Sequence, residues 1–245
     1  MIPEKLIKRL QAAKSVAVLT GAGVSAESGV ATFRGENGIW KKFRPEEMAN
    51  VDAFIRNPDL VWEWYQYRRQ LIEETKPNPG HFALVEMEKR YEDFLLITQN
   101  VDGLHQRAGS QKVVELHGNI LRNRCIECNK IYSELTLDDS KKVAPKCRNC
   151  GGLIRPDVVW FGEMLPEAAI AAANQAAAEC EVFFSVGTSA VVYPAAALPG
   201  IAKSHGSFIV EINPEPTPVS AFADVTIFEK SGVALPKIIE ELNRK

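Results

Sequence analysis

Four short apolar runs, each ending at a polar or glycine-rich cluster, constrain the fold more than any other feature of this sequence. Continuous apolar character indicates strands buried on both faces, as in a parallel sheet, and the clusters indicate that ligand binds at the carboxyl edge. The runs are Ser15–Thr20, Phe94–Thr98, Glu181–Val186 and Ser207–Ile212, and helical patterns cover Glu4–Ala13, His81–Tyr91, Pro166–Cys180 and Leu235–Asn243. We therefore predict an α/β fold with a Rossmann-like, doubly wound parallel sheet.

Two segments do not fit this alternation of strands and helices. Residues 36–79 are rich in aromatic and charged side chains and predict amphipathic helices where a second strand is expected, and residues 121–153 hold four of the five cysteines. We predict that this helical insertion and this zinc-binding insertion form a small domain. The Rossmann-like domain would then consist of residues 1–35, 80–120 and 154–245. A cleft between two such domains is a common place for a ligand.

The cysteines form two C-x-x-C pairs that are separated by 18 residues, Cys125 and Cys128 followed by Cys147 and Cys150. This spacing is typical of a tetrahedral four-cysteine zinc site. The alternatives are two disulfides, which a reducing cytoplasm disfavours, or four unrelated thiols. Because four thiolates leave zinc no open position, we predict one structural Zn²⁺ rather than a catalytic metal.

The charge balance and the apolar runs exclude two classes of protein. The chain has 29 Lys and Arg against 31 Asp and Glu, so it offers no electrostatic case for a dedicated nucleic-acid binder. The apolar runs fall far short of the roughly 20 residues that a membrane span needs, and no signal peptide is visible. We expect a cytoplasmic globular protein that binds neither membrane nor nucleic acid directly.

The first apolar run leads into Gly21-Ala22-Gly23-Val24-Ser25-Ala26, which matches the G-x-G-x-x-G/A pattern of dinucleotide binding. Such glycines let the backbone approach a pyrophosphate at a helix N-terminus. In ordinary dehydrogenases an acidic residue about 20 positions later holds a ribose. That region here belongs to the helical insertion, so the pattern favours a nucleotide site and disfavours an ordinary dehydrogenase.

A series of further blocks accompanies this motif in a characteristic order. The blocks are Gly21–Ser25, Gly29, Thr32–Gly35, Thr98–His105, Glu115–Gly118, the four cysteines, Gly187–Ser189 and Asn213-Pro214. In this order, over roughly Ser15–Leu235, the chain resembles the sirtuins, the NAD-dependent protein lysine deacylases. The resemblance implies that NAD is a consumed co-substrate, and that nicotinamide, deacylated lysine and O-acyl-ADP-ribose are products. It also implies that acyl-lysine proteins bind in extended form, and DNA-associated proteins could be among them.

The resemblance implies a catalytic set of His117, Asn100 and Asp102. His117 would activate a ribose hydroxyl, since an imidazole with a pKa near about 6.5 can accept a proton at neutral pH. From the sequence alone, a histidine before a glycine at a strand end is more often structural. Asn100 and Asp102 would bind the nicotinamide carboxamide and the nearby ribose, although N-x-D-G is also a turn motif.

Further residues are assigned to NAD and to the peptide by the same resemblance. Phe33 would cover the reacting ribose carbon, and Arg34 would reach the phosphates or order the loop. The alternatives are a core aromatic for Phe33 and a solvated charge for Arg34. The remaining predicted NAD contacts are Gly21, Ala22, Gly23, Ser25, Gln99, Val101, Gly187, Thr188, Ser189, Asn213 and Ser231. The peptide would pair with two stretches, Val158–Glu163 and Val191–Pro194, and the predicted contacts are Val158, Val159, Phe161 and Gly162. A buried strand is the alternative for the first stretch.

Tyr65 and Arg68 are three positions apart, so on a helix they share a face. They match the Y-x-x-R pair of the sirtuin class that removes succinyl and malonyl groups. The carboxylate of such a group needs a partner when it is buried, and an arginine fork beside a tyrosine hydroxyl supplies one. The alternative is a surface arginine on an aromatic-packed helix. We predict that the chain removes succinyl or malonyl groups besides acetyl groups.

Two other functions compete with a deacylase. A protein ADP-ribosyltransferase uses the same first step, and a non-catalytic NAD and zinc sensor would keep the nucleotide cradle but lack a base. The presence of His117, Asn100 and Asp102 argues against the sensor.

Overall fold

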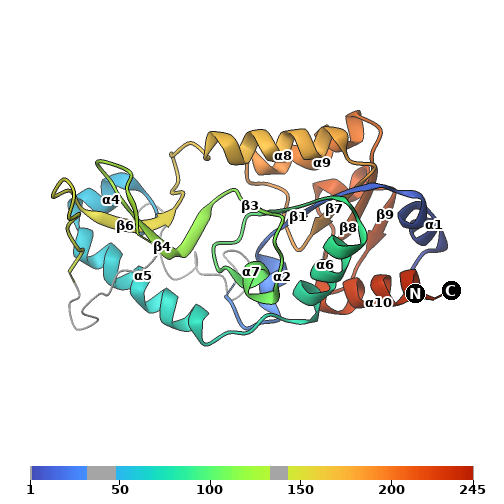
Figure 1. Ribbon diagram of the computed structural model, residues 1–245, viewed down its shortest axis with the longest axis horizontal. Helices are drawn as coiled ribbons and strands as arrows, with labels where there is room; N and C mark the ends of the chain where they lie inside the picture. The colour runs from blue at the N-terminus through green and yellow to red at the C-terminus, as the bar shows by residue number, and fades with distance from the viewer. Residues whose placement is uncertain (1, 32–47, 133–142, 245) are drawn as a thin grey trace.

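The computed structural model describes residues 2–31, 48–132 and 143–244, and its larger part is built on a six-stranded parallel sheet (Figure 1). The strand order is β3-β2-β1-β7-β8-β9. The strands are β1 (Ser15–Thr20), β2 (Asp93–Thr98), β3 (Val113–Glu115), β7 (Val182–Val186), β8 (Phe208–Ile212) and β9 (Val225–Ile227). The chain builds the sheet outward from β1 in one direction and then from β7 in the other. The sheet is therefore doubly wound, as predicted, with its switch point between β1 and β7.

Helices cover both faces of this sheet, which explains why its strands are apolar throughout. In Figure 1, α6 and α10 lie below the sheet and α8 and α9 above it. Val16 and Val18 of β1 pack into one core, whereas Ala17 and Leu19 pack into the other. The helices around the sheet are α1 (Glu4–Ala12), α2 (Ala22–Ala26), α6 (Pro79–Arg90), α7 (Leu104–Ala108), α8 (Glu167–Glu179), α9 (Leu198–Ser204) and α10 (Ser231–Asn243).

A second, antiparallel sheet lies at the other end of the molecule with the order β5-β4-β6 (Figure 1). Its strands are β4 (Gly118–Cys125), β5 (Ile131–Tyr132) and β6 (Ile154–Val158), and the helices α4 (Val51–Arg56) and α5 (Pro58–Glu73) pack against it. A third core, which includes Phe54, Trp62 and Trp160, lies between them. We propose on this basis that the chain divides into two domains, with the third core marking the smaller one. The strand β6 and the start of β4 belong to the small sheet, so this domain would extend beyond the predicted bounds of 121–153.

The helix starts follow from local hydrogen-bonding chemistry. Asn57 caps α5 by accepting a hydrogen bond from the backbone N–H of Leu60 at 3.3 Å, and Pro58 occupies the first helical position. Helix α10 begins at Ser231, four residues before the predicted start. Its Gly232 N–H donates to the Glu27 carboxylate at 2.8 Å, a cap that comes from far away in the sequence.

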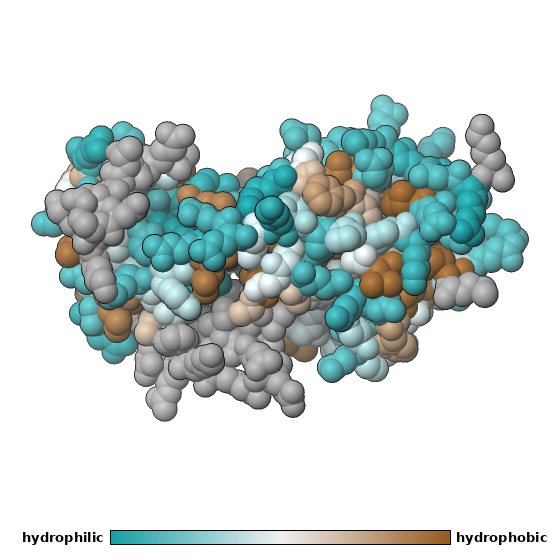
Figure 2. All heavy atoms as spheres, turned by 90° about the horizontal axis from the view of Figure 1, so that it is seen from below, coloured by the Kyte–Doolittle hydropathy of each residue, from teal (hydrophilic) through white to brown (hydrophobic). Residues whose placement is uncertain are grey.

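None of the described helices is long and apolar enough to cross a membrane. On the face seen from below, hydrophilic residues predominate among those coloured, and the hydrophobic ones form small separate groups (Figure 2).

Two buried histidines lie beneath the carboxyl edge of the parallel sheet. His81 accepts a hydrogen bond from the Asn78 N–H at 3.2 Å, and His105 Nε2 lies 3.0 Å from the Thr20 hydroxyl oxygen. The two ring centroids are 4.8 Å apart. Burial lowers the pKa of His81 to about 4 and that of His105 to about 3, so both rings are neutral near pH 7.

These histidines should make the protein less stable in acid. The unfolded chain takes up a proton at each near pH 6.5, whereas the folded chain does so only near the lowered pKa, so stability is full above pH 6.5 and falls below it. The expected slope is about 1.4 kcal/mol per pH unit for each histidine. His81→Gln keeps a hydrogen-bond acceptor at this position. Its free energy of unfolding in urea should depend less on pH between pH 7 and 5, by the uptake of about one proton on unfolding. The exposed His205, replaced by Gln, is the control, and equal slopes for wild type and His81→Gln would refute the interpretation.

Candidate functional site

The loops that follow β1 and β7 touch each other through their backbones at the switch point. The Gly21 N–H donates to the Val186 carbonyl at 3.1 Å, and the Gly23 N–H donates to the Gly187 carbonyl at 2.8 Å. A Cβ atom on Gly21 or on Gly23 would lie 2.8 Å from the Gly187 carbonyl oxygen. The two glycines are therefore required by this close packing, which places main-chain groups of both loops at the edge of a crevice.

A cavity of about 890 Å³ opens at this edge and extends to the small sheet. Most of the residues predicted from the sequence line it: Gly21, Ala22, Gly23, Tyr65, Arg68, Gln99, Asn100, Val101, His117, Val158, Val159, Phe161, Gly162, Gly187, Thr188, Ser189, Asn213 and Ser231. Two others, Ser25 and Asp102, are buried and are not part of its lining. Phe33 and Arg34 lie outside the described residues.

The ring of His117 is oriented by the main chain. Its Nδ1 lies 2.9 Å from the Gln99 carbonyl oxygen. Because a carbonyl only accepts, Nδ1 carries the hydrogen, and Nε2 remains the basic nitrogen. Burial lowers the pKa of His117, and the hydrogen bond to Gln99 opposes this only in part. The ring is therefore neutral and able to accept a proton at pH 7.

The glycine after His117 is required by the start of β4. Gly118 has a φ of 76°, and a Cβ atom there would lie 2.1 Å from the Asp157 carbonyl oxygen of β6. The backbone carbonyl of His117 accepts a hydrogen bond from the Val159 N–H at 2.9 Å. The histidine is thus tied to the segment after β6, which carries the predicted peptide contacts.

Asn100 and Asp102 lie in a tight turn after β2. The Asn100 amide nitrogen donates to the Gly21 carbonyl at 3.0 Å and to the Ser25 hydroxyl at 3.1 Å. The Asp102 carboxylate accepts from the Leu104 N–H at 2.9 Å, so the turn considered as the alternative is present. Burial raises the pKa of Asp102. The turn therefore fixes Asn100 against the glycine loop and leaves its amide at the cavity wall.

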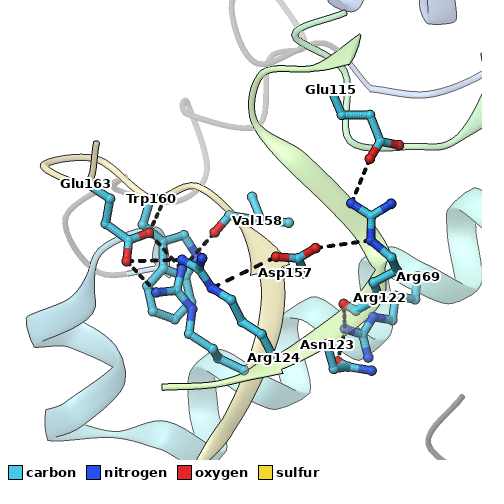
Figure 3. A network of polar contacts seen from close by, with 10 residues as sticks. Arg69, Glu115, Arg122, Asn123, Arg124, Asp157, Val158, Trp160 and Glu163 are labelled. Carbon is cyan, nitrogen blue, oxygen red and sulfur yellow. Dashed lines mark hydrogen bonds and ion pairs between the residues drawn. The ribbon is translucent and has the colours of Figure 1, made fainter. Parts of the chain in front are cut away.

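The structure separates two adjacent arginines of α5. Arg68 lines the cavity, with its guanidinium carbon 4.9 Å from the Trp64 ring centroid, and burial lowers its pKa. Arg69 instead binds β4: its Nε donates to the Ile120 carbonyl at 2.5 Å, and another nitrogen donates to the Asn123 side chain (Figure 3). Arg68 is 8% exposed, so the surface-arginine alternative is wrong for it.

Sequence reasoning missed the residues that support Tyr65. The Trp160 indole donates to the Tyr65 hydroxyl at 2.8 Å, and the buried Arg155 lies against the indole ring. An arginine in a short strand of the small sheet is a weak signal, and nothing in the sequence connects these residues to one another.

The four cysteines converge as their spacing predicted. Their sulfur atoms all lie within 4.8 Å of one another, with 3.5 Å between Cys125 and Cys150 and 3.7 Å between Cys128 and Cys147. Tetrahedral zinc with bonds of about 2.3 Å to sulfur requires sulfur atoms about 3.8 Å apart. All four are free cysteines, so the two-disulfide alternative is wrong. The donor set fits a structural zinc ion.

The fold and the site define an α/β protein with a nucleotide-sized cleft at the sheet switch point and a four-thiolate metal site in its smaller part. A family model described as the Sir2 family matches residues 21–194. Among curated relatives, the NAD-dependent protein deacylase of Aquifex aeolicus is 54% identical and covers 94% of this chain and 96% of its own length. The NAD-dependent protein deacylase of Pyrococcus furiosus is 49% identical and covers 97% of each chain.

Solved structures agree with these sequence relatives. A Sir2 homologue in complex with NAD superposes with a TM-score of 0.92 and 45% identity, over 99% of this chain and 94% of the other. A Sir2 complex with a deacetylated p53 peptide and 3'-O-acetyl ADP-ribose superposes with a TM-score of 0.86 and 35% identity, over 98% of each chain. The chain belongs to the Sir2 family, and the predicted fold and family are confirmed.

The metal site gives a direct test. The purified protein should contain one zinc ion per chain, and Cys147→Ala should lose the metal and loosen the small sheet, because site formation is coupled to folding. Elemental analysis and thermal unfolding measure the two effects. Cys180 lies outside the cluster, so Cys180→Ala should keep its zinc. Native protein without zinc, or Cys147→Ala with full zinc content, would show that the four-cysteine interpretation is wrong.

Proposed function

We propose that the protein is an NAD-dependent protein deacylase that removes acetyl groups, and also succinyl and malonyl groups, from lysine side chains. The observation that carries this proposal is a single cavity that brings together the glycine loops, a neutral and oriented His117, and the Tyr65–Arg68 pair. The curated relatives with the same family core are named NAD-dependent protein deacylases.

The residues around the switch point fit NAD. Main-chain groups of Gly21–Gly23 and Gly187–Ser189 lie at the cavity wall. The glycines have no side chain that would keep a phosphate away from these main-chain groups. When bound, NAD supplies the ADP-ribosyl group that receives the acyl group as nicotinamide leaves. Asn100, fixed by two hydrogen bonds, would hold the carboxamide of nicotinamide. Ser25 and Asp102 are buried beside the cavity and would not touch NAD directly. Ser25 would hold the Asn100 side chain in place, and Asp102 would hold the turn that carries it.

His117 acts as the base in this proposal. The Gln99 carbonyl holds the Nδ1 proton, so a ribose hydroxyl can lose its proton only to Nε2. The lowered pKa keeps Nε2 unprotonated at neutral pH. The hydrogen bond between the His117 carbonyl and the Val159 N–H fixes the position of this base relative to the segment on which the peptide would lie.

The peptide would lie between Val158–Gly162 and Val191–Pro194. Val158 ends β6, and the residues after it run along the cavity with Phe161 54% exposed. Tyr193 in the second stretch also lines the cavity and is 76% exposed. Two stretches that line one cavity, each with an exposed aromatic side chain, fit an extended backbone between them. The relative that binds a deacetylated p53 peptide supports this assignment.

Tyr65 and Arg68 would set the choice of acyl group. Both line the cavity and are almost completely buried, and neither is needed to bind a methyl group. A buried guanidinium beside a phenol hydroxyl matches a terminal carboxylate in charge and hydrogen bonding. We therefore assign this end of the cavity to succinyl and malonyl chains.

Replacing His117 with Ala should abolish turnover while NAD still binds. Removal of a general base lowers the rate about 10²- to 10⁴-fold, whereas the ring is not part of the cores. Peptide deacylation by mass spectrometry and NAD binding by calorimetry give the two values. His205→Ala, on the exposed end of α9, is the matched control. Turnover of His117→Ala within a few-fold of wild type would refute the assignment.

Replacing Arg68 with Met should impair desuccinylation selectively. Loss of a charge-assisted hydrogen bond costs about 1.5–3 kcal/mol, which corresponds to about a ten- to hundredfold loss in kcat/KM for a succinyl-lysine peptide. The acetyl form of the same peptide should lose little. By contrast, Arg69→Met should lower stability and both activities, because Arg69 binds β4. Equal losses on both acyl groups in Arg68→Met would make the Tyr65–Arg68 pair structural.

A further inference from the structure

The hydrogen bond between Trp160 and Tyr65 has a fixed direction. The indole Nε1–H donates to the Tyr65 hydroxyl oxygen at 2.8 Å, and both residues are at most 2% exposed. An indole nitrogen only donates, whereas a phenol oxygen both accepts and donates. The contact therefore uses a lone pair of Tyr65 and not its proton, so the hydroxyl remains a donor.

An ion pair between the buried Arg155 and the half-buried Glu163 holds the Trp160 ring in place. The Arg155 guanidinium carbon lies 3.3 Å from the ring centroid. Glu163 accepts from two nitrogens of Arg155, at 2.5 and 2.8 Å, and from the Trp160 backbone N–H at 2.7 Å. Because both terminal nitrogens of the planar Arg155 guanidinium donate to Glu163, the group cannot rotate freely. The Arg155–Glu163 pair therefore forms a rigid platform for the indole. Rotation of the indole away from Tyr65 would break its stacking on that platform.

Further charges connect this platform to the rest of the small sheet. Figure 3 shows Glu163 and Trp160 at one end of a network that continues through Arg124 and Asp157 to Arg122 and Glu115. Arg124 lies 3.5 Å from Glu163, and Arg122 lies 3.1 Å from Asp157 and 2.6 Å from Glu115. Each carboxylate in this network has a cationic partner, so the platform stays charged and ordered at neutral pH.

We propose that Arg155, Glu163 and Trp160 form a positioning relay that presents the Tyr65 hydroxyl as a hydrogen-bond donor to acyl groups that end in a carboxylate. This inference rests on the proposed acyl specificity of the Tyr65–Arg68 pair. A carboxylate only accepts hydrogen bonds, so it needs the phenol proton. If the Tyr65 hydroxyl donated its hydrogen bond to another group of the protein, its oxygen would present a lone pair to the carboxylate and would repel the carboxylate. An acetyl group ends in a methyl group and does not distinguish the two cases.

The test compares wild type, Trp160→Phe, Tyr65→Phe and the double variant on one peptide carrying either succinyl-lysine or acetyl-lysine. Phe keeps an aromatic ring against Arg155 but removes the five-membered part of the indole together with its N–H. Trp160→Phe should lower the ratio of succinyl to acetyl kcat/KM about two- to tenfold, as for loss of one neutral hydrogen bond, because any loss in peptide binding is common to both substrates. In the Tyr65→Phe background, the same replacement should have no further effect on this ratio, because the hydroxyl it acts on is gone.

Trp62→Phe is the matched control, since Trp62 is equally buried in the same core and its ring faces Arg69 instead. It should lower stability and leave the ratio of succinyl to acetyl kcat/KM unchanged. Equal losses on both peptides in Trp160→Phe, or the same loss with and without the Tyr65 hydroxyl, would overturn the relay while desuccinylation itself stands. A wild-type enzyme that removes acetyl but not succinyl would instead overturn the proposed acyl specificity together with the relay.

Discussion

Backbone contact between the loops after β1 and β7 is the constraint on which the site depends. Gly21 and Gly23 approach Gly187 so closely that no side chain fits between the loops. The Gln99 N–H then donates to the Thr20 carbonyl at 3.0 Å, and the Gln99 carbonyl orients His117. The glycine loops, the turn after β2 and His117 are thus connected by main-chain groups, and the proposed catalytic geometry depends on these contacts.

The small domain contributes chemistry of a different kind. Its aromatic core surrounds buried cations, with Arg155 against Trp160 and Arg69 near Trp62. Buried guanidinium groups need carboxylates, carbonyls or aromatic faces around them, and here they have all three. The same packing leaves Arg68 at the cavity wall. The part of the chain around the small sheet therefore supplies both the four-cysteine cluster and the proposed polar end of the acyl pocket.

The sequence predicted the parts of the structure that depend on local pattern. The four apolar runs became strands within one residue of their predicted bounds, because burial on both faces requires uninterrupted apolar residues. The strands β3 and β9 were missed, since three residues are too few to show a pattern. The link from Arg155 through Trp160 to Tyr65 was missed because its members meet only after folding. Phe33 and Arg34 stay predictions, as they lie outside the described residues.

The stoichiometry of the reaction is the most direct test of the function proposed for this cavity. Wild-type protein is incubated with NAD and an acyl-lysine peptide, and deacylated peptide, nicotinamide and O-acyl-ADP-ribose are quantified together by mass spectrometry. A deacylase of this kind produces the three in equal amounts. Release of nicotinamide with the acyl-lysine intact and ADP-ribose attached to protein would contradict the account and establish an ADP-ribosyltransferase instead.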